Sequence, residues 1–316
     1  MFAEDVDLLP NKMFKRMLEH AATRPDEFQS LASDLFKAMK SGGRIGYEHV
    51  AWFNGGLFND ETALALDKDD IVLTLSAAKL DWAEIDPSIL GTLFERGLDP
   101  DKRSQLGAHY TDRDKIMMIV NPVIVGPWLR EWETVKTEIT QAMSAVREAQ
   151  KRVPEKQSDA RKVYAAARRA EEGAKKEATS LFINFLDRLR NFRVLDPACG
   201  SGNFLYLALL ALKDIEHRAN IEGEMLGLRR QAPAVGPEAV LGIEINPYAA
   251  ELARVSVWIG EIQWMQRNGF GVSDRPILKP LETIECRDAI LSEQMTTATW
   301  PTADVVIGKA TGKVAF

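Results

Sequence analysis

The sequence predicts an α/β protein in which a helical N-terminal region precedes a doubly wound parallel sheet. Two observations carry this prediction. Residues 1 to about 100 place apolar side chains at helical spacing, with loops between the segments. From residue 192 onward, short β-rich runs alternate with long helical segments, which is the pattern of strands joined by crossover helices. The 316 residues suffice for one large domain or two ordinary ones.

The N-terminal region, residues 1–103, is expected to be mainly helical. MFKRMLEHA (13–21) and FQSLASDLFKAMK (28–40) carry apolar residues three and four apart, and Ser-Gly-Gly at 41–43 ends the second helix as a C-cap would. AWFNGGLFND (51–60) contains a glycine pair and is expected to be a turn-rich crossing. Another short helix is expected before residue 100, bounded on each side by Asp-Pro.

Residues 129–190 form the next unit, dense in Ala, Glu, Lys and Arg and interrupted at Pro154. Proline removes a helical donor and clashes with the preceding turn, so we expect two helices in an antiparallel hairpin. Acidic and basic residues alternate along it, which favours a solvated face over a DNA-facing one.

Four strands are expected between residues 192 and 308. FRVLDPA and VLGIEIN are each followed by a helix, the first from about 204 to 219 and the second from 247 to 266. TIEC and ADVVIG are expected to be the third and fourth strands. Alternation of this kind predicts a parallel sheet.

The nine residues from Asp196 to Phe204, DPACGSGNF, have the composition of a ligand-binding turn between a strand and a helix. Gly200 and Gly202 let the backbone approach a ligand closely, and a helix that starts near Asn203 offers unpaired amides. A dinucleotide site requires a third glycine where Leu205 stands, and a phosphate-binding P-loop requires Gly-Lys-Ser/Thr. A tight turn without a ligand fits the glycines but not the whole nonapeptide.

Glu244 ends the second expected strand, at the edge where such sheets bind ligands. A carboxylate there can accept hydrogen bonds from both hydroxyls of a ribose, whereas an unbonded one would be costly. The separation from Asp196 exceeds the roughly 20 residues of dinucleotide folds, because a long helix and its following loop intervene.

Composition argues against several other classes. No apolar run reaches the ~20 residues needed to span a bilayer, and the N-terminus has acids where a secretory signal needs bases. Cys199 and Cys286 are the only cysteines, which fits a reducing cytoplasm, and Cys199 is expected to be a small loop residue because no base pairs with it. The four histidines lack metal-ligand spacing, so no metal site is expected. The net charge of −6 lacks the basic excess of an autonomous DNA-binding protein.

Several motifs resemble those of a known family. DPACGSGNFL closely resembles motif I of the adenine-specific DNA methyltransferases, and GIEINPYAAELA resembles their motif II. SQLGAHYT (104–111) resembles the Gly-x-Tyr-Thr motif that precedes motif I in the gamma-ordered group. The stretch EIDPSILGTLFERGLDPDKRSQLGAHYT, with FNGGLF upstream, further resembles type IIL single-chain restriction–modification proteins and BREX phage-defence methylases. The resemblance covers roughly residues 45–308.

The resemblance implies an incomplete Rossmann-like methyltransferase sheet that uses S-adenosylmethionine and acts on double-stranded DNA. The methyltransferase part would run over 104–316, with the motif loop at 104–111, the hairpin at 129–190 and the α/β part at 192–308. Tyr110 and Thr111 would close over the methionine end of the cofactor, and Asp196 would lie near its amino group. Glu244 would hold the ribose and Asp288 the adenine amine. The residues expected to contact the cofactor are Tyr110, Thr111, Asp196, Ala198, Gly200, Gly202, Asn203, Phe204, Glu244, Ile245 and Asp288.

The chain departs from the family pattern after Gly308. The family has Asn-Pro-Pro followed by Phe or Tyr there, whereas this chain has Lys309, Ala310, Thr311 and Gly312. That motif supplies the acceptors for the target amine and an aromatic ring that stacks on the flipped base, and Lys309 carries donors only. We therefore expect no methyl transfer by this chain. No Glu-x-Lys or Asp-x-Lys of a metal-dependent nuclease occurs either.

Three functions stay open at this point. The first is the cofactor-binding portion of an adenine methyltransferase in restriction–modification or phage defence. The second is a non-catalytic S-adenosylmethionine-binding or scaffold subunit. A methyltransferase acting on RNA or protein is the third, disfavoured by the Asp-Pro start of motif I and by the gamma order.

The last expected strand also predicts a property of the surface. In the family this strand lies centrally in the sheet, so here it would form an edge with Val305, Val306 and Ile307 facing outward. Exposed apolar edges pair with other chains. We therefore expect self-association through residues 303–308, or a poorly ordered C-terminal segment.

Overall fold

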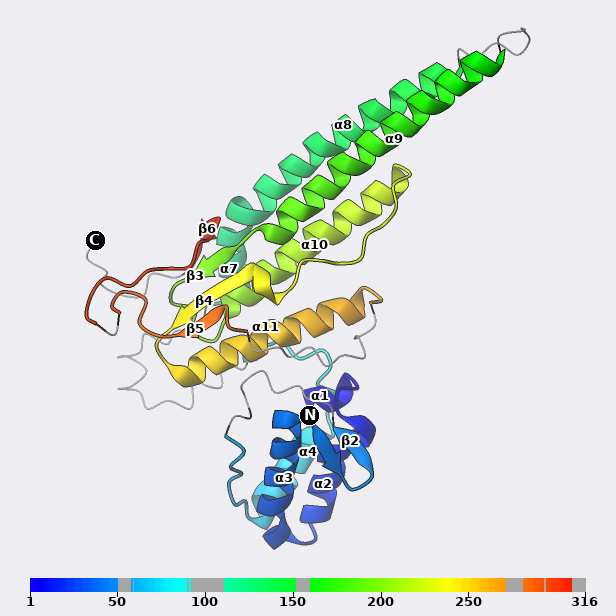
Figure 1. Ribbon diagram of the computed structural model, residues 1–316. Coiled ribbons are helices and arrows are strands. Elements are labelled where there is room, and N and C mark those ends of the chain that lie inside the picture. The colour runs from blue at the N-terminus through cyan, green and yellow to red at the C-terminus, as the bar shows by residue number, and fades with distance from the viewer. Residues whose placement is uncertain are drawn as a thin grey trace.

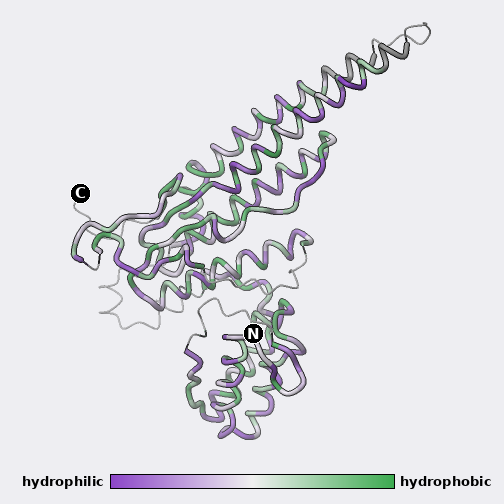
Figure 2. Tube along the Cα trace, viewed as in Figure 1, coloured by the Kyte–Doolittle hydropathy of each residue, from purple (hydrophilic) through white to green (hydrophobic). Residues whose placement is uncertain are grey.

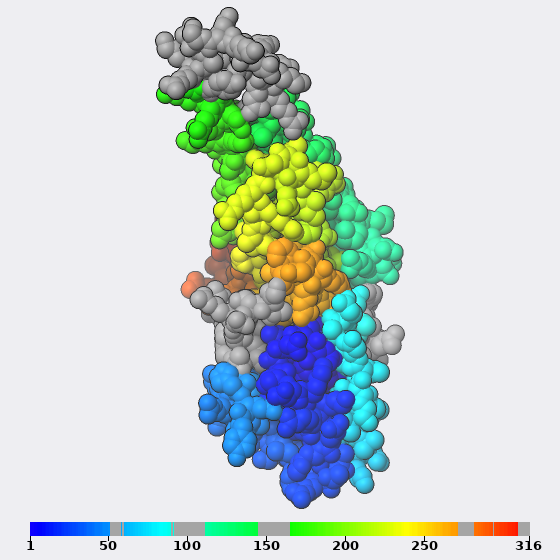
Figure 3. All heavy atoms as spheres, turned by 90° about the vertical axis from the view of Figure 1, so that its right-hand side faces the viewer, coloured from blue at the N-terminus to red at the C-terminus, as the bar shows by residue number. Residues whose placement is uncertain are grey.

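The computed structural model describes residues 1–50, 58, 60–89, 91, 111–151, 160–270, 281–292 and 294–308. The molecule is elongated, with the N-terminal helices at one end and a long helical hairpin at the other (Figures 1 and 3). The α/β part lies between them. Expected features at 51–57, at 92–110 and after Gly308 lie outside the described residues.

The N-terminal region is helical, as predicted, and adds a small β-hairpin that the sequence analysis missed. Gly42, at φ 75°, follows the third helix and confirms the expected stop. Gly46, at φ 59°, supplies the positive φ of a two-residue turn between two antiparallel strands. The elements are α1 (Phe2–Asp5), η1 (Pro10–Lys12), α2 (Met13–Ala21), η2 (Pro25–Glu27), α3 (Phe28–Ser41), β1 (Gly43–Ile45), β2 (Glu48–Val50) and α4 (Lys68–Ala78).

The predicted hairpin is confirmed, with α8 (Gly126–Lys151) and α9 (Ala160–Asn191) side by side. Helix α7 (Arg113–Val120) leads into it through a single π-helical segment, η3 (Asn121–Val125). Aromatic side chains fill the base of the hairpin, where Trp132 packs against Phe182 and Phe185. Figure 2 shows hydrophilic and hydrophobic residues alternating along both helices, as expected where one face is solvated.

All four predicted strands are present and form one parallel sheet in the order β5-β4-β3-β6. Of the four strands in this sheet, β3 comes first in the chain. It has β4 on one side and β6 on the other, so the winding reverses beside β3. Ligands bind beyond the carboxyl ends of strands at such a reversal. The elements are β3 (Val194–Asp196), α10 (Asn203–Met225), η4 (Pro237–Ala239), β4 (Val240–Glu244), α11 (Pro247–Arg267), β5 (Ile284–Cys286) and β6 (Val305–Val306).

The two faces of the sheet pack separately, because successive side chains of a strand point to opposite faces. Val194 and Val240 belong to the main core, which the helices of the hairpin and α10 complete. Leu195, Leu241 and Ile243 form a second buried cluster on the other face.

Strand β6 lies at the edge of the sheet among the described residues, as predicted, but one of its expected outward side chains is buried. Val306 is 51% exposed, whereas Ile307 is only 5% exposed and belongs to the main core. Val305 is partly buried and packs against the same core. The prediction that Val305 and Ile307 face outward is therefore wrong, since the alternation along the strand turns both inward. The amide of Ile307 donates to the carbonyl of Leu195 at 2.8 Å, which fixes this register. Self-association through this edge stays a prediction.

Candidate cofactor site

The loop between β3 and α10 lies at the carboxyl end of the sheet, beside the reversal of strand order. Gly200 has φ 53° and Gly202 has φ 83°, both in the left-handed region that favours glycine. Helix α10 begins at Asn203, as predicted, so its first amides border the loop. The sequence therefore folds here into a tight strand-to-helix turn.

Glu244 joins this loop to the end of β4. One carboxylate oxygen accepts a hydrogen bond from the amide of Gly200 at 2.8 Å, and the other accepts one from the amide of Asn246 at 2.8 Å. A carboxylate oxygen has more than one lone-pair direction, so both oxygens can still accept from a ligand. The sequence analysis predicted Glu244 as an acceptor for ribose hydroxyls. It missed that Glu244 also accepts a hydrogen bond from the backbone of the loop.

Asp196 is buried at the end of β3, with only 1% of its surface exposed. The amide of Ala198 donates to its Oδ1 at 3.1 Å. Burial raises the pKa of Asp196 to about 7, and the charge of Glu244 adds to the rise. Gly308 approaches from the end of β6 with φ 148°, and a Cβ there would stand 2.7 Å from Oδ1. The carboxyl ends of three strands thus meet around this side chain.

The two glycines of the loop have different surroundings. A Cβ on Gly200 would point into open space, so its backbone is accessible to a ligand. A Cβ on Gly202 would stand 2.8 Å from the Cα of Ala253, so this glycine allows α11 to approach the start of α10. Both glycines were predicted to contact the cofactor, and this stays a prediction. The packing of α11 against Gly202 is by itself a reason for a glycine at that position.

Asn203 and Thr111 lie on a small chamber beside the loop, together with Tyr206 from the first turn of α10. Asn203 is 8% exposed, and its Oδ1 has no hydrogen-bond partner among the residues that the structure describes. Phe204, next in the chain, is 6% exposed and belongs to the main core. Tyr110, the expected neighbour of Thr111, lies outside the described residues.

The remaining expected contacts lie on the surface beyond β4 and β5. Ala198 is exposed, and Ile245 is 61% exposed directly after Glu244. Asp288 accepts hydrogen bonds from the amides of Ile290 at 2.7 Å and Leu291 at 3.1 Å, which lower the pKa of its carboxyl group. Lys309, Ala310, Thr311 and Gly312, where the family motif would stand, lie outside the described residues.

The sequence analysis missed three groups that shape this surface. Asn246 caps α11 by accepting from the amides of Tyr248 at 2.9 Å and Ala249 at 3.1 Å. An Asn directly before a Pro at a helix start is a recognisable signal for this cap. The side chains of Tyr248 and Ile290 are 59% and 60% exposed near the expected adenine position, and no local pattern marks them.

Cys199 is a buried loop residue, as predicted. It is 6% exposed, and burial together with the nearby carboxylates of Asp196 and Glu244 raises the pKa of its thiol well above the usual value. Its sulfur lies against Gly242, where a Cβ would stand 2.8 Å away. The thiol therefore stays protonated and serves packing.

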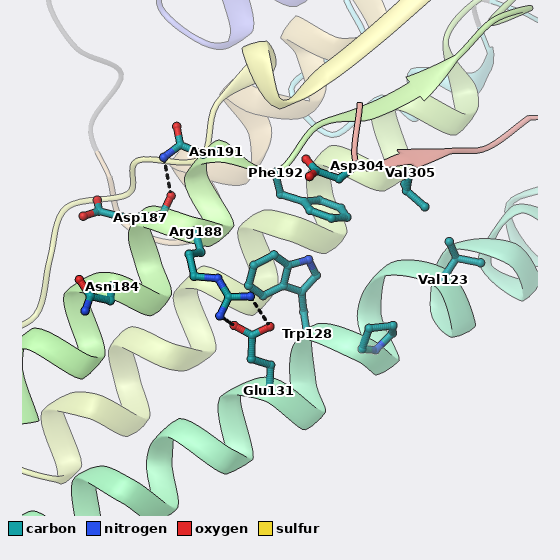
Figure 4. Close-up of a pocket in the computed structure, with 11 residues that line it drawn as sticks. Val123, Trp128, Glu131, Asn184, Asp187, Arg188, Asn191, Phe192, Asp304 and Val305 are labelled. Atoms are coloured by element: carbon teal, nitrogen blue, oxygen red, sulfur yellow. Dashed lines mark hydrogen bonds and ion pairs between the residues drawn. The ribbon is translucent and has the colours of Figure 1, made fainter. Parts of the chain in front are cut away.

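A larger depression lies elsewhere, between the base of the hairpin and β6 (Figure 4). It measures about 790 Å³ and is lined by Trp128, Phe192 and Val305 among others. Arg188 pairs with Glu131 across it at 2.6 Å. Phe192 precedes β3, so this groove lies at the amino ends of the strands, away from the edge where such sheets bind ligands. None of the expected cofactor residues lines it.

The chain is similar to several known proteins. Residues 169–303 match the family model for the MmeI DNA-methyltransferase domain, and residues 1–58 match that for the MmeI helicase spacer domain. The chain is 28% identical over 308 residues to DNA methyltransferase A of Bacillus subtilis, covering 92% of this chain and 30% of that protein. It is 23% identical over 245 residues to a putative type II restriction enzyme and methyltransferase of Methanocaldococcus jannaschii, covering 69% of this chain and 19% of that protein.

A solved structure shows the same fold. The type IIL restriction–modification enzyme MmeI, in complex with DNA, superimposes with a TM-score of 0.68 and 22% identity, over 93% of this chain and 36% of that one. This chain spans about a third or less of the length of each of these three proteins. Residues 1–58 are therefore similar to the MmeI helicase spacer domain, and residues 169–303 are similar to the MmeI DNA-methyltransferase domain. The chain has the Rossmann-like fold of that enzyme and resembles the type IIL restriction–modification proteins.

Proposed function

We propose that this chain provides the S-adenosylmethionine-binding portion of an adenine-specific DNA methyltransferase in a restriction–modification or phage-defence system. The observation that carries the proposal is the hydrogen bond between Glu244 and the amide of Gly200, which joins the two halves of the expected site at 2.8 Å. The family of the matched domain, DNA methyltransferases, supports the reaction class.

The described residues fit this cofactor. Gly200 leaves open space where a Cβ would block a ligand, and the first amides of α10 border that space. Glu244 would hold the ribose hydroxyls, and Asp196 would face the amino group of the methionine part. Ile245 and Asp288 would take the adenine ring and its amine. When bound, the cofactor supplies an activated methyl group.

The residues of this chain would position and desolvate that group rather than activate the target base. The acceptor for a target amine would have to come from the positions after Gly308, where Lys309 offers donors only. We therefore propose that this chain binds cofactor and does not methylate DNA. DNA would be the partner of the longer protein, and a cytoplasmic location fits the use of two free cysteines.

The runner-up is a non-catalytic cofactor-binding or scaffold subunit. The methyltransferase proposal and this one both include cofactor binding, so an acceptor motif after Gly308 separates them by favouring the methyltransferase.

No helix within the described ranges is long and apolar enough to cross a bilayer.

Two measurements test the proposal. Calorimetry with S-adenosylhomocysteine should give saturable binding of one molecule per chain, and an unsaturable titration would refute the cofactor site. Incubation with tritiated S-adenosylmethionine and mixed-sequence duplex DNA should leave adenine unlabelled. Label in adenine above the level of a DNA-only control would show that another residue holds the amine.

A further inference from the structure

A short segment of the N-terminal region, here called the strap, runs along the methyltransferase part. It comprises residues 83–89 and Gly91. The amide nitrogen of the Gln263 side chain, on α11, donates to the strap carbonyls of Ala83 at 2.7 Å and Ile85 at 2.8 Å. Gln263 is only 2% exposed, and these partly buried hydrogen bonds join two parts of the chain far apart in sequence. One helical turn further along α11, Arg267 donates to the Glu84 carboxylate at 2.9 Å.

The other end of the strap reaches the cofactor loop itself. A Cβ on Gly91 would overlap the hydroxyl of Ser201, and the side-chain nitrogen of Asn203 lies 3.7 Å from the same point. Ser201 and Asn203 flank Gly202 in the loop. The strap therefore packs directly on the turn whose Gly200 amide is bonded to Glu244.

Between these two ends the strap borders a small chamber. Asp86 and Ser88 line it from the strap, and Thr111, Arg113 and Tyr206 line it from the methyltransferase part. Burial raises the pKa of the Tyr206 hydroxyl, the charge of Asp86 adds to the rise, and the charge of Arg113 opposes it. The buried Oδ1 of Asn203, without a partner among the described residues, opens on the same chamber wall.

We propose that the strap couples the docking of the N-terminal region to occupation of the cofactor loop. The inference rests on the proposed cofactor site. A ligand that fixes the loop also fixes Ser201 and Asn203, and these residues form the surface on which Gly91 packs. Coupling of this kind is reciprocal: whatever factor the ligand adds to strap docking, docking adds to ligand affinity.

Hydrogen exchange on the full wild-type chain tests the coupling without any substitution. Saturating S-adenosylhomocysteine should slow amide exchange in residues 83–89 by about five-fold or more. Peptides from α4, which lies in the same N-terminal region but outside the strap, should exchange at an unchanged rate. Equal slowing of both segments would indicate general stabilisation and would overturn the proposal.

Substitutions test the reverse direction. Gln263→Ala removes both strap hydrogen bonds and should weaken S-adenosylhomocysteine binding, by at most the factor that the ligand adds to strap docking. Asn268→Ala is the matched control, because Asn268 bonds only to the carbonyl of Trp264 within α11 among the contacts described, at 2.9 Å. Glu84→Gln, at an exposed position, gives a milder strap variant if the buried substitution unfolds the chain.

The outcomes separate the two proposals. Absence of ligand binding by the wild-type chain would refute the cofactor site. Normal binding by the wild type, with unchanged exchange at 83–89 and with unchanged affinity in Glu84→Gln and Gln263→Ala, would refute the strap and leave the cofactor site standing.

Discussion

The carboxylate of Glu244 accepts a hydrogen bond from the backbone amide of Gly200, which lies 44 residues earlier in the chain, at 2.8 Å. The bond joins the end of β4 to the loop after β3, which is where the expected ribose and methionine contacts of the cofactor meet. The same side chain therefore shapes the loop and offers acceptors to a ligand.

Replacing Glu244 should weaken cofactor binding more than a single lost contact would. Glu244→Ala removes the acceptor for the amides of Gly200 and Asn246 as well as for the ribose. Charge-assisted hydrogen bonds are worth about 1.5–3 kcal/mol each, so we expect at least a several-fold loss of affinity for S-adenosylhomocysteine by calorimetry. Glu282→Gln, on the exposed loop before β5, is the control. Equal affinity in Glu244→Ala and wild type would remove Glu244 from the site.

The raised pKa of Asp196 predicts that the free energy of unfolding depends on pH. Its pKa is raised to about 7 in the folded chain by burial and by Glu244, against 3.8 for the free group. The folded state therefore holds this proton more tightly than the unfolded state does. Ionised Asp196 destabilises the fold fully above pH 7, and the cost disappears as the pH falls from 7 towards 4. Asp196→Asn should stabilise the chain at pH 8, by up to roughly 4 kcal/mol, and have little effect at pH 4.5.

Denaturant titrations at the two pH values measure this difference. Asp187→Asn, on the surface of α9, serves as a control for the loss of one negative charge. A stability gain in Asp196→Asn that is the same at pH 4.5 and pH 8 would contradict the raised pKa.

The two loop glycines should respond differently to the same substitution. Gly202→Ala places a Cβ 2.8 Å from the Cα of Ala253 at φ 83°, so both backbone strain and a helix–helix clash oppose it. Gly200→Ala meets open space and incurs only the strain of φ 53°, about 1 kcal/mol. We expect thermal unfolding to show a much larger loss of stability for Gly202→Ala. Gly200→Ala should instead lose cofactor affinity, because its methyl group enters the ligand's space; equal melting temperatures would contradict this assignment.

The two cysteines should differ in reactivity. Cys199 is buried, and the pKa of its thiol is raised well above the usual value, so it presents almost no thiolate. Cys286 is exposed at the end of β5. Iodoacetamide under native conditions should therefore modify Cys286 alone, as read by peptide mass spectrometry. Cys286→Ser should remove native labelling, and denaturation should restore labelling at Cys199. Rapid native labelling of Cys199 would show that the loop opens.

The sequence by itself determined the succession of elements and the composition of the candidate site. Apolar spacing predicted α2 and α3, because helical periodicity is a local property, and composition predicted the helices of the hairpin. Gly42 marked the end of α3 for an equally local reason, a positive φ. The loop from Asp196 to Phe204 and the carboxylate of Glu244 were also recognisable, because a strand-to-helix turn with glycines has few other uses.

Only the tertiary structure decided what individual residues of that site do. Gly200 and Gly202 look alike in sequence and share a positive φ, yet one faces open space and the other faces Ala253 on a different helix. The raised pKa of Asp196 depends on burial beneath three strand ends, and the inward turn of Ile307 depends on the register of β6 against β3. The strap rests on Gln263, whose partners lie far away in the chain. Such contacts join distant segments through packing, and no local pattern of residues encodes which segments will meet.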